Sequence, residues 1–219
     1  MKTNKLILPA IFLLLMTEAS FSAAKNEALS VIREITASQV SSSRKASPKP
    51  ARKASSPEID PRARNIYALF TKVNPKLDQA SAKKYAEIVI EAAGKYKQDP
   101  YVIAAIIVHE STVNSKALSK GGDYGLMQVR WKVHEKAIKQ RFPNVRKAGD
   151  MFDARTNIMF GTEIFSDCMR KAGNDAAKGL MRYSAGNTKM RDKVIATVKE
   201  LRAQDNAMKT ISIQKKKGK

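Results

Sequence analysis

The sequence predicts a mostly α-helical domain, preceded by an export signal and a flexible linker. Two observations predict this fold class. From about Ile59 onward, apolar residues recur at the three- and four-residue spacing of amphipathic helices. The alternating runs of Val, Ile and Tyr that are typical of β-strands are missing from the same stretch. A large sheet is therefore not expected.

The first residues of the chain have the pattern of a secretory signal. Lys2 and Lys5 form a basic start, residues 6–16 are apolar, and residues 20–24 supply small side chains at a cleavage zone. The apolar run falls short of the roughly 20 residues that a membrane-spanning helix needs. We therefore expect residues 1–23 to be a signal peptide, with the mature protein exported to the periplasm or cell wall and without a transmembrane anchor.

The next segment, residues 24–60, has the composition of a linker. Its Ser-, Pro- and Lys-rich runs show no apolar periodicity, so we expect it to be disordered. At the other end, residues 206–219 include the run Gln214–Lys217 and are expected to form a disordered basic tail. The folded domain is thus predicted to span residues 61–205.

Within this domain, successive helices are predicted from local patterns. Apolar residues between Tyr85 and Tyr96 lie at helical spacing, which indicates an amphipathic helix. Asp99 and Pro100 then supply an N-cap and a first-turn proline. The helix that they open, from Tyr101 to about Ser111, is apolar on nearly every side and is expected at the centre of the domain. Further helices are predicted at about residues 131–141, 154–171, 175–184 and 187–204.

The charge of the chain favours an anionic partner. The net charge is +21, and from residue 65 onward 30 basic residues face 15 acidic ones. Such an excess can be a solvated surface, or it can attract an acidic polymer, an anionic lipid or a nucleic acid. Export argues against nucleic acid, and bacterial wall polymers are anionic. The wall is therefore the expected partner.

Few residues are available for metal or nucleophilic chemistry. Cys168 is the only cysteine, so no internal disulfide can form, and it is expected to be buried. His109 and Glu110 begin like the zinc motif H-E-x-x-H, but Val113 stands where the second histidine is needed. Neither a phosphate-binding glycine loop nor a G-x-S-x-G motif is present. No metal or organic cofactor is expected.

The stretch from Tyr101 to Gln128 carries the strongest functional signal. An apolar helix ends there in one acidic residue, Glu110, and a glycine-rich turn follows. A carboxyl group at the end of a buried helix is partly desolvated, which favours its neutral, proton-donating form. Beside a cleft, such a group can act as the general acid that cuts a glycosidic bond. Glu110 is therefore the candidate catalytic residue.

Four short motifs follow one another along the chain. They are Glu110-Ser111 with Ser119 nine positions after the glutamate, Gly125-Leu126-Met127-Gln128, Asn157-Ile158-x-x-Gly161, and Tyr183-Ser184-Ala185-Gly186. In order and spacing they resemble those of soluble lytic transglycosylases and goose-type lysozymes, the SLT-type members of family-23 glycoside hydrolases. The resemblance covers about residues 80 to 200. It implies a lysozyme-like helical domain with a cleft that binds the glycan strands of peptidoglycan.

The resemblance also implies roles for single residues. Glu110 matches the one catalytic acid/base of the family, and in the transglycosylases this residue yields a 1,6-anhydromuramic acid end. Tyr183 matches a cleft tyrosine whose hydroxyl can orient the glutamate. Met127 is expected to lie mainly in the core. The candidate substrate-binding residues are Ser119, Gly125, Met127, Gln128, Asn157 and Tyr183.

Some positions depart from the family pattern and leave alternatives open. Ser184 stands where Asn is usual, Ile164 and Phe165 occupy the region of a second cleft tyrosine, and residues 191–192 replace a Tyr-Val pair. The chain could also be a lysozyme-type hydrolase if Asp123 faced the cleft and held a water, although this residue is expected in a turn. A second alternative is a catalytically silent wall-binding module of a cell-envelope-spanning secretion or assembly system.

Overall fold

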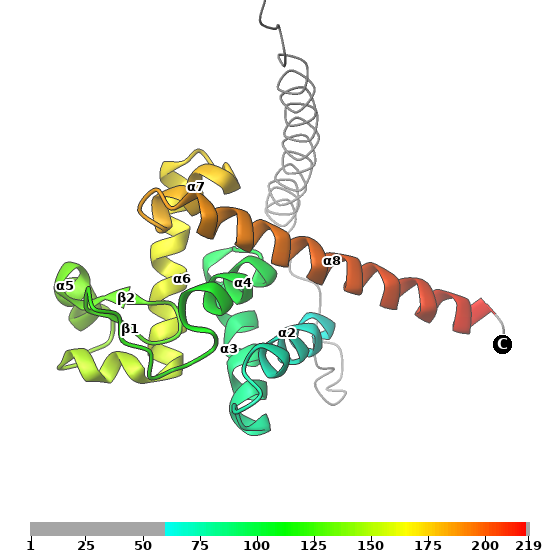
Figure 1. The fold of residues 1–219 in the computed structure, drawn as a ribbon, viewed down its shortest axis with the longest axis horizontal. Helices are drawn as coiled ribbons and strands as arrows, with labels where there is room; N and C mark the ends of the chain where they lie inside the picture. The colour runs from blue at the N-terminus through cyan, green and yellow to red at the C-terminus, as the bar shows by residue number, and fades with distance from the viewer. Residues whose placement is uncertain (1–59, 218–219) are drawn as a thin grey trace, which may run out of the picture.

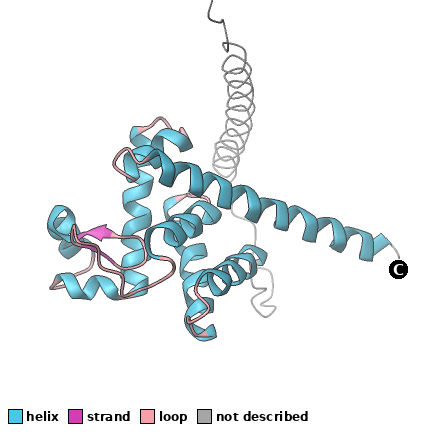
Figure 2. Ribbon diagram, in the orientation of Figure 1, coloured by secondary structure: helices cyan, strands magenta, loops and turns pink. Residues whose placement is uncertain are grey.

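The computed structural model describes residues 60–217, which form a helical domain with one small hairpin (Figures 1 and 2). The predicted signal peptide and almost all of the predicted linker lie outside the described residues. In chain order the elements are α2 (Pro61–Val73), α3 (Gln79–Tyr96), α4 (Pro100–Ser111), β1 (Asp123–Tyr124), β2 (Val129–Arg130), α5 (Trp131–Arg141), the 3₁₀ helix η1 (Ala148–Phe152), α6 (Ala154–Lys171), α7 (Ala176–Tyr183) and α8 (Thr188–Lys217). The prediction of a mostly helical fold without a large sheet is confirmed.

Helix α4 lies at the centre, as its apolar sequence predicted. The Asp99 carboxylate caps its start by accepting a hydrogen bond from the backbone N–H of Tyr101 at 2.8 Å, and Pro100 occupies the first turn. Every residue from Pro100 to Val108 is buried, and α2, α3 and α8 pack around the helix. The last turn of α4 is therefore held on a rigid, fully packed base.

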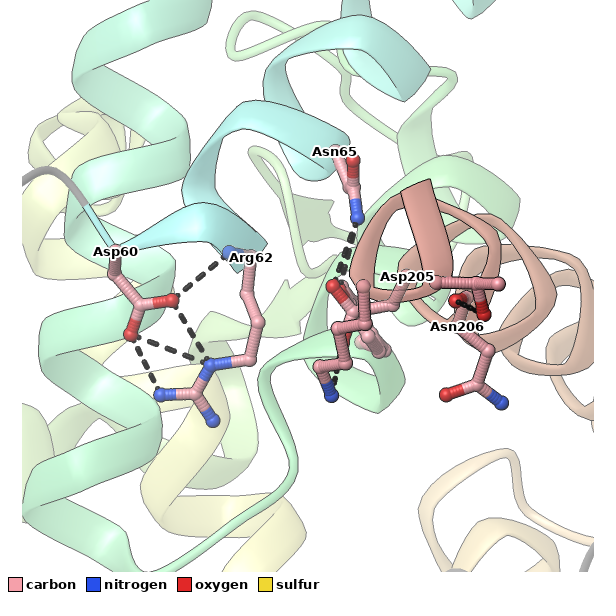
Figure 3. Close-up of polar contacts among 8 residues, drawn as sticks. Asp60, Arg62, Asn65, Asp205 and Asn206 are labelled. Atoms are coloured by element: carbon pink, nitrogen blue, oxygen red, sulfur yellow. Dashed lines mark hydrogen bonds and ion pairs between the residues drawn. The ribbon is translucent and has the colours of Figure 1, made fainter. Parts of the chain in front are cut away.

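Hydrogen bonds join α2 and α4 to α8, which lies much later in the sequence. The side-chain amide of Asn65 donates to the Tyr101 hydroxyl at 3.1 Å and to the Asp205 carboxylate at 3.3 Å, which it faces in Figure 3. The same middle part of α8 also carries Arg202, whose guanidinium donates to the buried Asp99 carboxylate at 2.6 Å. These bonds fix the direction of α8 across the domain.

Helix α8 is longer than predicted. It runs to Lys217 rather than to about residue 204, and its second half projects beyond the other elements (Figure 1). The expectation of disorder at Gln214–Lys217 is therefore wrong. Burial of Val194, Val198 and Leu201 stabilises the first half of the helix. Since extension costs much less than nucleation, the Lys-, Gln- and Met-containing second half can continue it without further packing.

The remaining elements pack around α6 and the β-hairpin. Strands β1 and β2 pair antiparallel, with Asp123 opposite Arg130 and Tyr124 opposite Val129. Helix α6 is capped by the Asp153 carboxylate, packs on α3, and contacts β2, η1 and α7.

No helix within residues 60–217 is both long and apolar enough to cross a membrane.

Candidate active site

Glu110 lies in the last turn of α4, where the chain changes direction abruptly. The next two residues after Ser111, Thr112 and Val113, both adopt left-handed backbone conformations, with φ of 51° and 59°. This conformation is unfavourable for β-branched residues and persists only where the surroundings enforce it. Val113 is fully buried, and its carbonyl accepts a hydrogen bond from the Asn74 side chain at 3.2 Å. The turn ends the helix directly after the acid.

The Glu110 side chain faces a cavity of about 580 Å³. The cavity lies between the end of α4, the β-hairpin, one face each of α5 and α6, and the segment that joins α7 to α8. Its lining combines apolar and polar side chains, among them Gln128, Val133, His134, Phe160, Ile164 and Tyr183. A concave site with a few polar groups on an apolar lining is typical of ligand binding.

The environment of Glu110 makes it a proton donor near neutral pH. Its carboxyl group is partly buried and forms no hydrogen bond or ion pair with any described residue. Burial raises the pKa of Glu110 from 4.5 to about 7, and the nearby negative charge of Asp123 adds to this rise. A substantial fraction of the side chain is therefore protonated at pH 7.

The other acids on the cavity wall are already paired. Asp123 pairs with Arg130 at 2.7 Å, Glu163 with Arg141, and Asp167 with Arg170 at 2.8 Å. The hydrogen bonds from Arg130 and, to a smaller extent, Ser119 hold the pKa of Asp123 below its usual value. Among the described residues that line the cavity, Glu110 is thus the one acid without a basic partner.

Three of the sequence motifs meet at one residue, Met127. Its backbone N–H donates to the Asn157 side-chain oxygen at 2.8 Å, and its carbonyl accepts from the Tyr183 hydroxyl at 2.8 Å. Its side chain lies against Gly161, where an added Cβ would approach the Met127 sulfur to 2.6 Å. The motifs around residues 125, 157 and 183 therefore hold a single segment of chain beside Glu110.

Asn157 and Gly125 make the further contacts that fix the loop around Met127. The fully buried Asn157 amide donates to the carbonyls of Tyr124 at 2.7 Å and Met151 at 3.0 Å. Gly125 has φ of +73°, and a Cβ at this position would lie 2.5 Å from the Asn157 nitrogen. Only glycine fits both the conformation and the space. The loop that carries Gln128 is thereby fixed against α6.

The structure brings together three of the predicted site residues at the cavity: Glu110, Gln128 and Tyr183. The Gln128 side-chain nitrogen donates to the Gly125 carbonyl at 2.9 Å, and its oxygen has no bonding partner in the described part of the chain. The Tyr183 hydroxyl donates to Met127 and forms no hydrogen bond with Glu110. Burial, followed by the charge of Glu110, raises the pKa of Tyr183 well above 10.

The other predicted site residues lie behind the cavity surface. Asn157 and Met127 are fully buried, and Gly125 packs on Asn157. The Ser119 hydroxyl donates to the Asp123 carboxylate at 2.7 Å and accepts the backbone N–H of Asp123 at 3.1 Å. In this structure these four residues hold the loop and hairpin in place.

Several cavity residues carried no recognisable signal in the sequence. Arg130, Arg141, Lys171 and Arg182 all line the cavity, but no single one stands out among 41 basic residues. Val133, which is 67% exposed, offers a partial signal. It is an apolar residue on a helix that is otherwise largely polar.

Comparisons with known proteins assign this part of the chain to a known domain family. The family described as Transglycosylase SLT domain matches residues 87–206, a span that includes all of the cavity residues named above. The chain is also similar to membrane-bound lytic murein transglycosylase E of Buchnera aphidicola subsp. Acyrthosiphon pisum (strain APS). The two are 30% identical over 117 residues, which cover 51% of this chain and 52% of that protein. The chain therefore spans about half the length of this curated relative.

Proposed function

Since the chain belongs to the Transglycosylase SLT domain family, we propose that it is a peptidoglycan lytic transglycosylase with Glu110 as its catalytic acid and base. It cleaves the bond between N-acetylmuramic acid and N-acetylglucosamine and leaves a 1,6-anhydromuramic acid end. The observation that carries this proposal is the pairing pattern of the cavity acids. Glu110 is unpaired and has a pKa of about 7, whereas the other described acids of the lining are bound to arginines.

In the first step, the protonated Glu110 carboxyl donates its proton to the glycosidic oxygen. The bond from this oxygen to the anomeric carbon breaks, the N-acetylglucosamine end leaves as an alcohol, and positive charge develops on the muramoyl ring. The raised pKa of Glu110 supplies the protonated form near neutral pH. Burial of the acid therefore serves this step directly.

In the second step, the Glu110 carboxylate takes the proton of the muramoyl 6-hydroxyl, whose oxygen bonds to the anomeric carbon. Glu110 returns to its protonated form, and no water is consumed. Glycosidases that hydrolyse their substrates normally need two carboxylates, one as acid and one as base or nucleophile. Here the substrate supplies the nucleophile, so a single unpaired acid is sufficient.

Gln128 and Tyr183 are the residues that we propose to contact the sugar rings. The free amide oxygen of Gln128 can accept a hydrogen bond from an N-acetyl or hydroxyl group. The Tyr183 ring, which packs edge-on against Phe165 with ring centroids 5.8 Å apart, offers a flat apolar face. Ser119, Gly125, Met127 and Asn157 would act by holding these two residues in place.

Hydrolysis is the nearest alternative, because Asp123 lines the same cavity. To activate a water, Asp123 would need a free carboxylate oxygen. One of its oxygens accepts from the Arg130 Nε at 2.7 Å, and the other from the Ser119 hydroxyl at 2.7 Å and from the Arg130 Nη2 at 3.0 Å. This pairing favours transglycosylation over hydrolysis.

The signal-like N-terminal pattern supports action outside the cytoplasm, in the periplasm or cell wall. The net charge of +21 suits an anionic wall. A cell-envelope-spanning secretion or assembly system is a fitting partner, because opening the glycan mesh makes room for such a system. The Ser/Pro/Lys-rich segment at residues 24–60 is the proposed docking region.

The test is mass spectrometry of the soluble products from purified peptidoglycan, digested in water enriched in ¹⁸O. The proposal expects muropeptides that are lighter by one water and carry no ¹⁸O, and it expects Glu110→Gln to release none. Reducing ends that contain ¹⁸O would instead establish hydrolysis, and Asp123→Asn would then abolish the reaction. Strands that bind without any cleavage would identify a wall-binding module.

A further inference from the structure

A second hollow of about 530 Å³ opens beside the catalytic cavity. It is formed by the end of α6, by α7 and by the start of α8. We call it the basic pocket and define it by its charged residues, Lys171, Lys178, Arg182 and Arg191. No acidic residue of the described chain lines it. Lys171 and Arg182 also line the catalytic cavity, so the two hollows adjoin at these side chains.

Two cations of the basic pocket are unpaired in the described part of the chain, and two pair with carboxylates that do not line the pocket. Neither Lys171 nor Arg182 forms an ion pair or side-chain hydrogen bond with another residue of the described chain. Lys178 lies 3.8 Å from Asp175, and Arg191 contacts Asp192 through Nη2 at 2.7 Å and Nε at 2.8 Å. Both carboxylates are exposed, and pairs with exposed carboxylates contribute little, so a ligand carboxylate can compete for the same two cations.

This arrangement differs from that of the other cations around the catalytic cavity. Arg130 and Arg141 bind Asp123 and Glu163, which themselves line that cavity, whereas Asp175 and Asp192, the partners of Lys178 and Arg191, do not line the basic pocket. In the basic pocket, by contrast, positive charge gathers from three helices without an acid among its lining residues. A cluster of one sign at the rim of a cleft attracts and orients a ligand of the opposite sign.

We propose that the basic pocket binds a carboxylate of the stem peptide on the muramoyl residue of a bound strand. This inference rests on the proposed function, which places a glycan strand in the adjoining cavity. The sugar rings are uncharged, so the anions of such a strand are the carboxylates of its peptide side chains. Lys171 and Arg182 guide the peptide out of the cleft, and Lys178 and Arg191 bind its carboxylate.

The experiment compares two substrates and two double variants. The substrates are peptidoglycan strands with intact stem peptides and the same strands after conversion of their carboxylates to neutral amides. Lys178→Gln/Arg191→Gln alters residues that line only the basic pocket. Lys76→Gln/Lys84→Gln removes the same charge from exposed positions elsewhere and is the matched control.

For the wild type we expect kcat/KM to be about tenfold lower on the amidated strands than on the intact ones. The Lys178→Gln/Arg191→Gln variant should have about tenfold lower kcat/KM than wild type on intact strands and the same kcat/KM as wild type on amidated strands. The control variant should keep the wild-type preference for intact strands. Equal wild-type cleavage of both substrates, or an equal loss by the variant on both, would overturn the inference.

Binding separates this inference from the proposed function. Affinities of both substrates for Glu110→Gln, measured by titration calorimetry with and without the two pocket substitutions, do not depend on turnover. If Glu110→Gln binds amidated strands more weakly than intact ones, and the pocket substitutions remove this difference in affinity, the basic pocket is supported even if no strand is cut. Binding that is indifferent to amidation overturns it, even if the enzyme cleaves peptidoglycan as proposed.

Discussion

Replacing Glu110 with glutamine is expected to stabilise the protein at alkaline pH and to have little effect at acidic pH. Burial and the charge of Asp123 raise the pKa of Glu110 from 4.5 to about 7. The carboxyl of an unfolded chain ionises from about pH 4.5, whereas the folded protein resists ionisation up to about pH 7. The destabilising effect of the charge is therefore absent below pH 4.5, grows as the pH rises, and is complete above pH 7.

The magnitude follows from the size of this rise. A difference of one pKa unit corresponds to about 1.4 kcal/mol, so the full effect at pH 8 is about 3 kcal/mol. Glu110 is partly exposed, and solvent screening lowers this to about 2 kcal/mol. At pH 5 less than about 1 kcal/mol is expected. Glutamine has nearly the same shape and no charge, so it removes this penalty while it keeps the packing.

Urea unfolding followed by circular dichroism at pH 5 and pH 8 measures the effect. The free energy of unfolding of Glu110→Gln, relative to wild type, should increase by about 2 kcal/mol between the two pH values. Glu200→Gln, at an exposed position on α8, is the matched control and should show the same small effect at both. A Glu110→Gln effect that is equal at pH 5 and pH 8 would refute the burial argument.

Two further substitutions test the surroundings of Glu110. Tyr183→Phe removes the donor to the Met127 carbonyl and should lower the free energy of unfolding by about 1–2 kcal/mol in urea titrations; unchanged stability would contradict the role of this bond. Asp123→Asn removes a charge that raises the pKa of Glu110 and leaves Arg130 unpaired, so the alkaline limb of the pH–rate profile should move to lower pH. Because burial contributes more than Asp123, that limb should remain above the pH expected for an exposed glutamate. A limb that stays in place or moves upward would contradict the electrostatic coupling.

The helices were predictable because their signals are local. The predicted boundaries of 131–141 and 154–171 agree with α5 and α6, and the central position of α4 is confirmed. Asp99 caps α4 as its place before a proline indicated. Capping residues and apolar periodicity act within a few residues of the position that they determine, so a single sequence displays them in full.

The parts that could not be predicted depend on contacts between distant residues. Each strand of the hairpin has only two residues, too few for an alternating pattern. The hydrogen bond between the Met127 backbone and the Asn157 side chain joins residues 30 positions apart. The sequence around either residue does not indicate which residue it will contact. The resemblance to the family marked Gly125, Met127 and Asn157 as site residues, but only the structure separates these supports from the cavity surface.

The convergence of three motifs on Met127 also makes them interdependent. The Asn157 side chain accepts a hydrogen bond from the Met127 N–H, and the Tyr183 hydroxyl donates one to the Met127 carbonyl. Both side chains therefore restrain the same peptide segment. When one of these bonds is lost, the segment can shift, and the other bond is then worth less than in the intact protein. The effects of Asn157 and Tyr183 substitutions should therefore not add up in a double-mutant cycle. A substitution around Met127 that is tolerated when both hydrogen bonds are present can destabilise the protein when one is already lost. Each of the three motifs therefore constrains which substitutions the other two can accept.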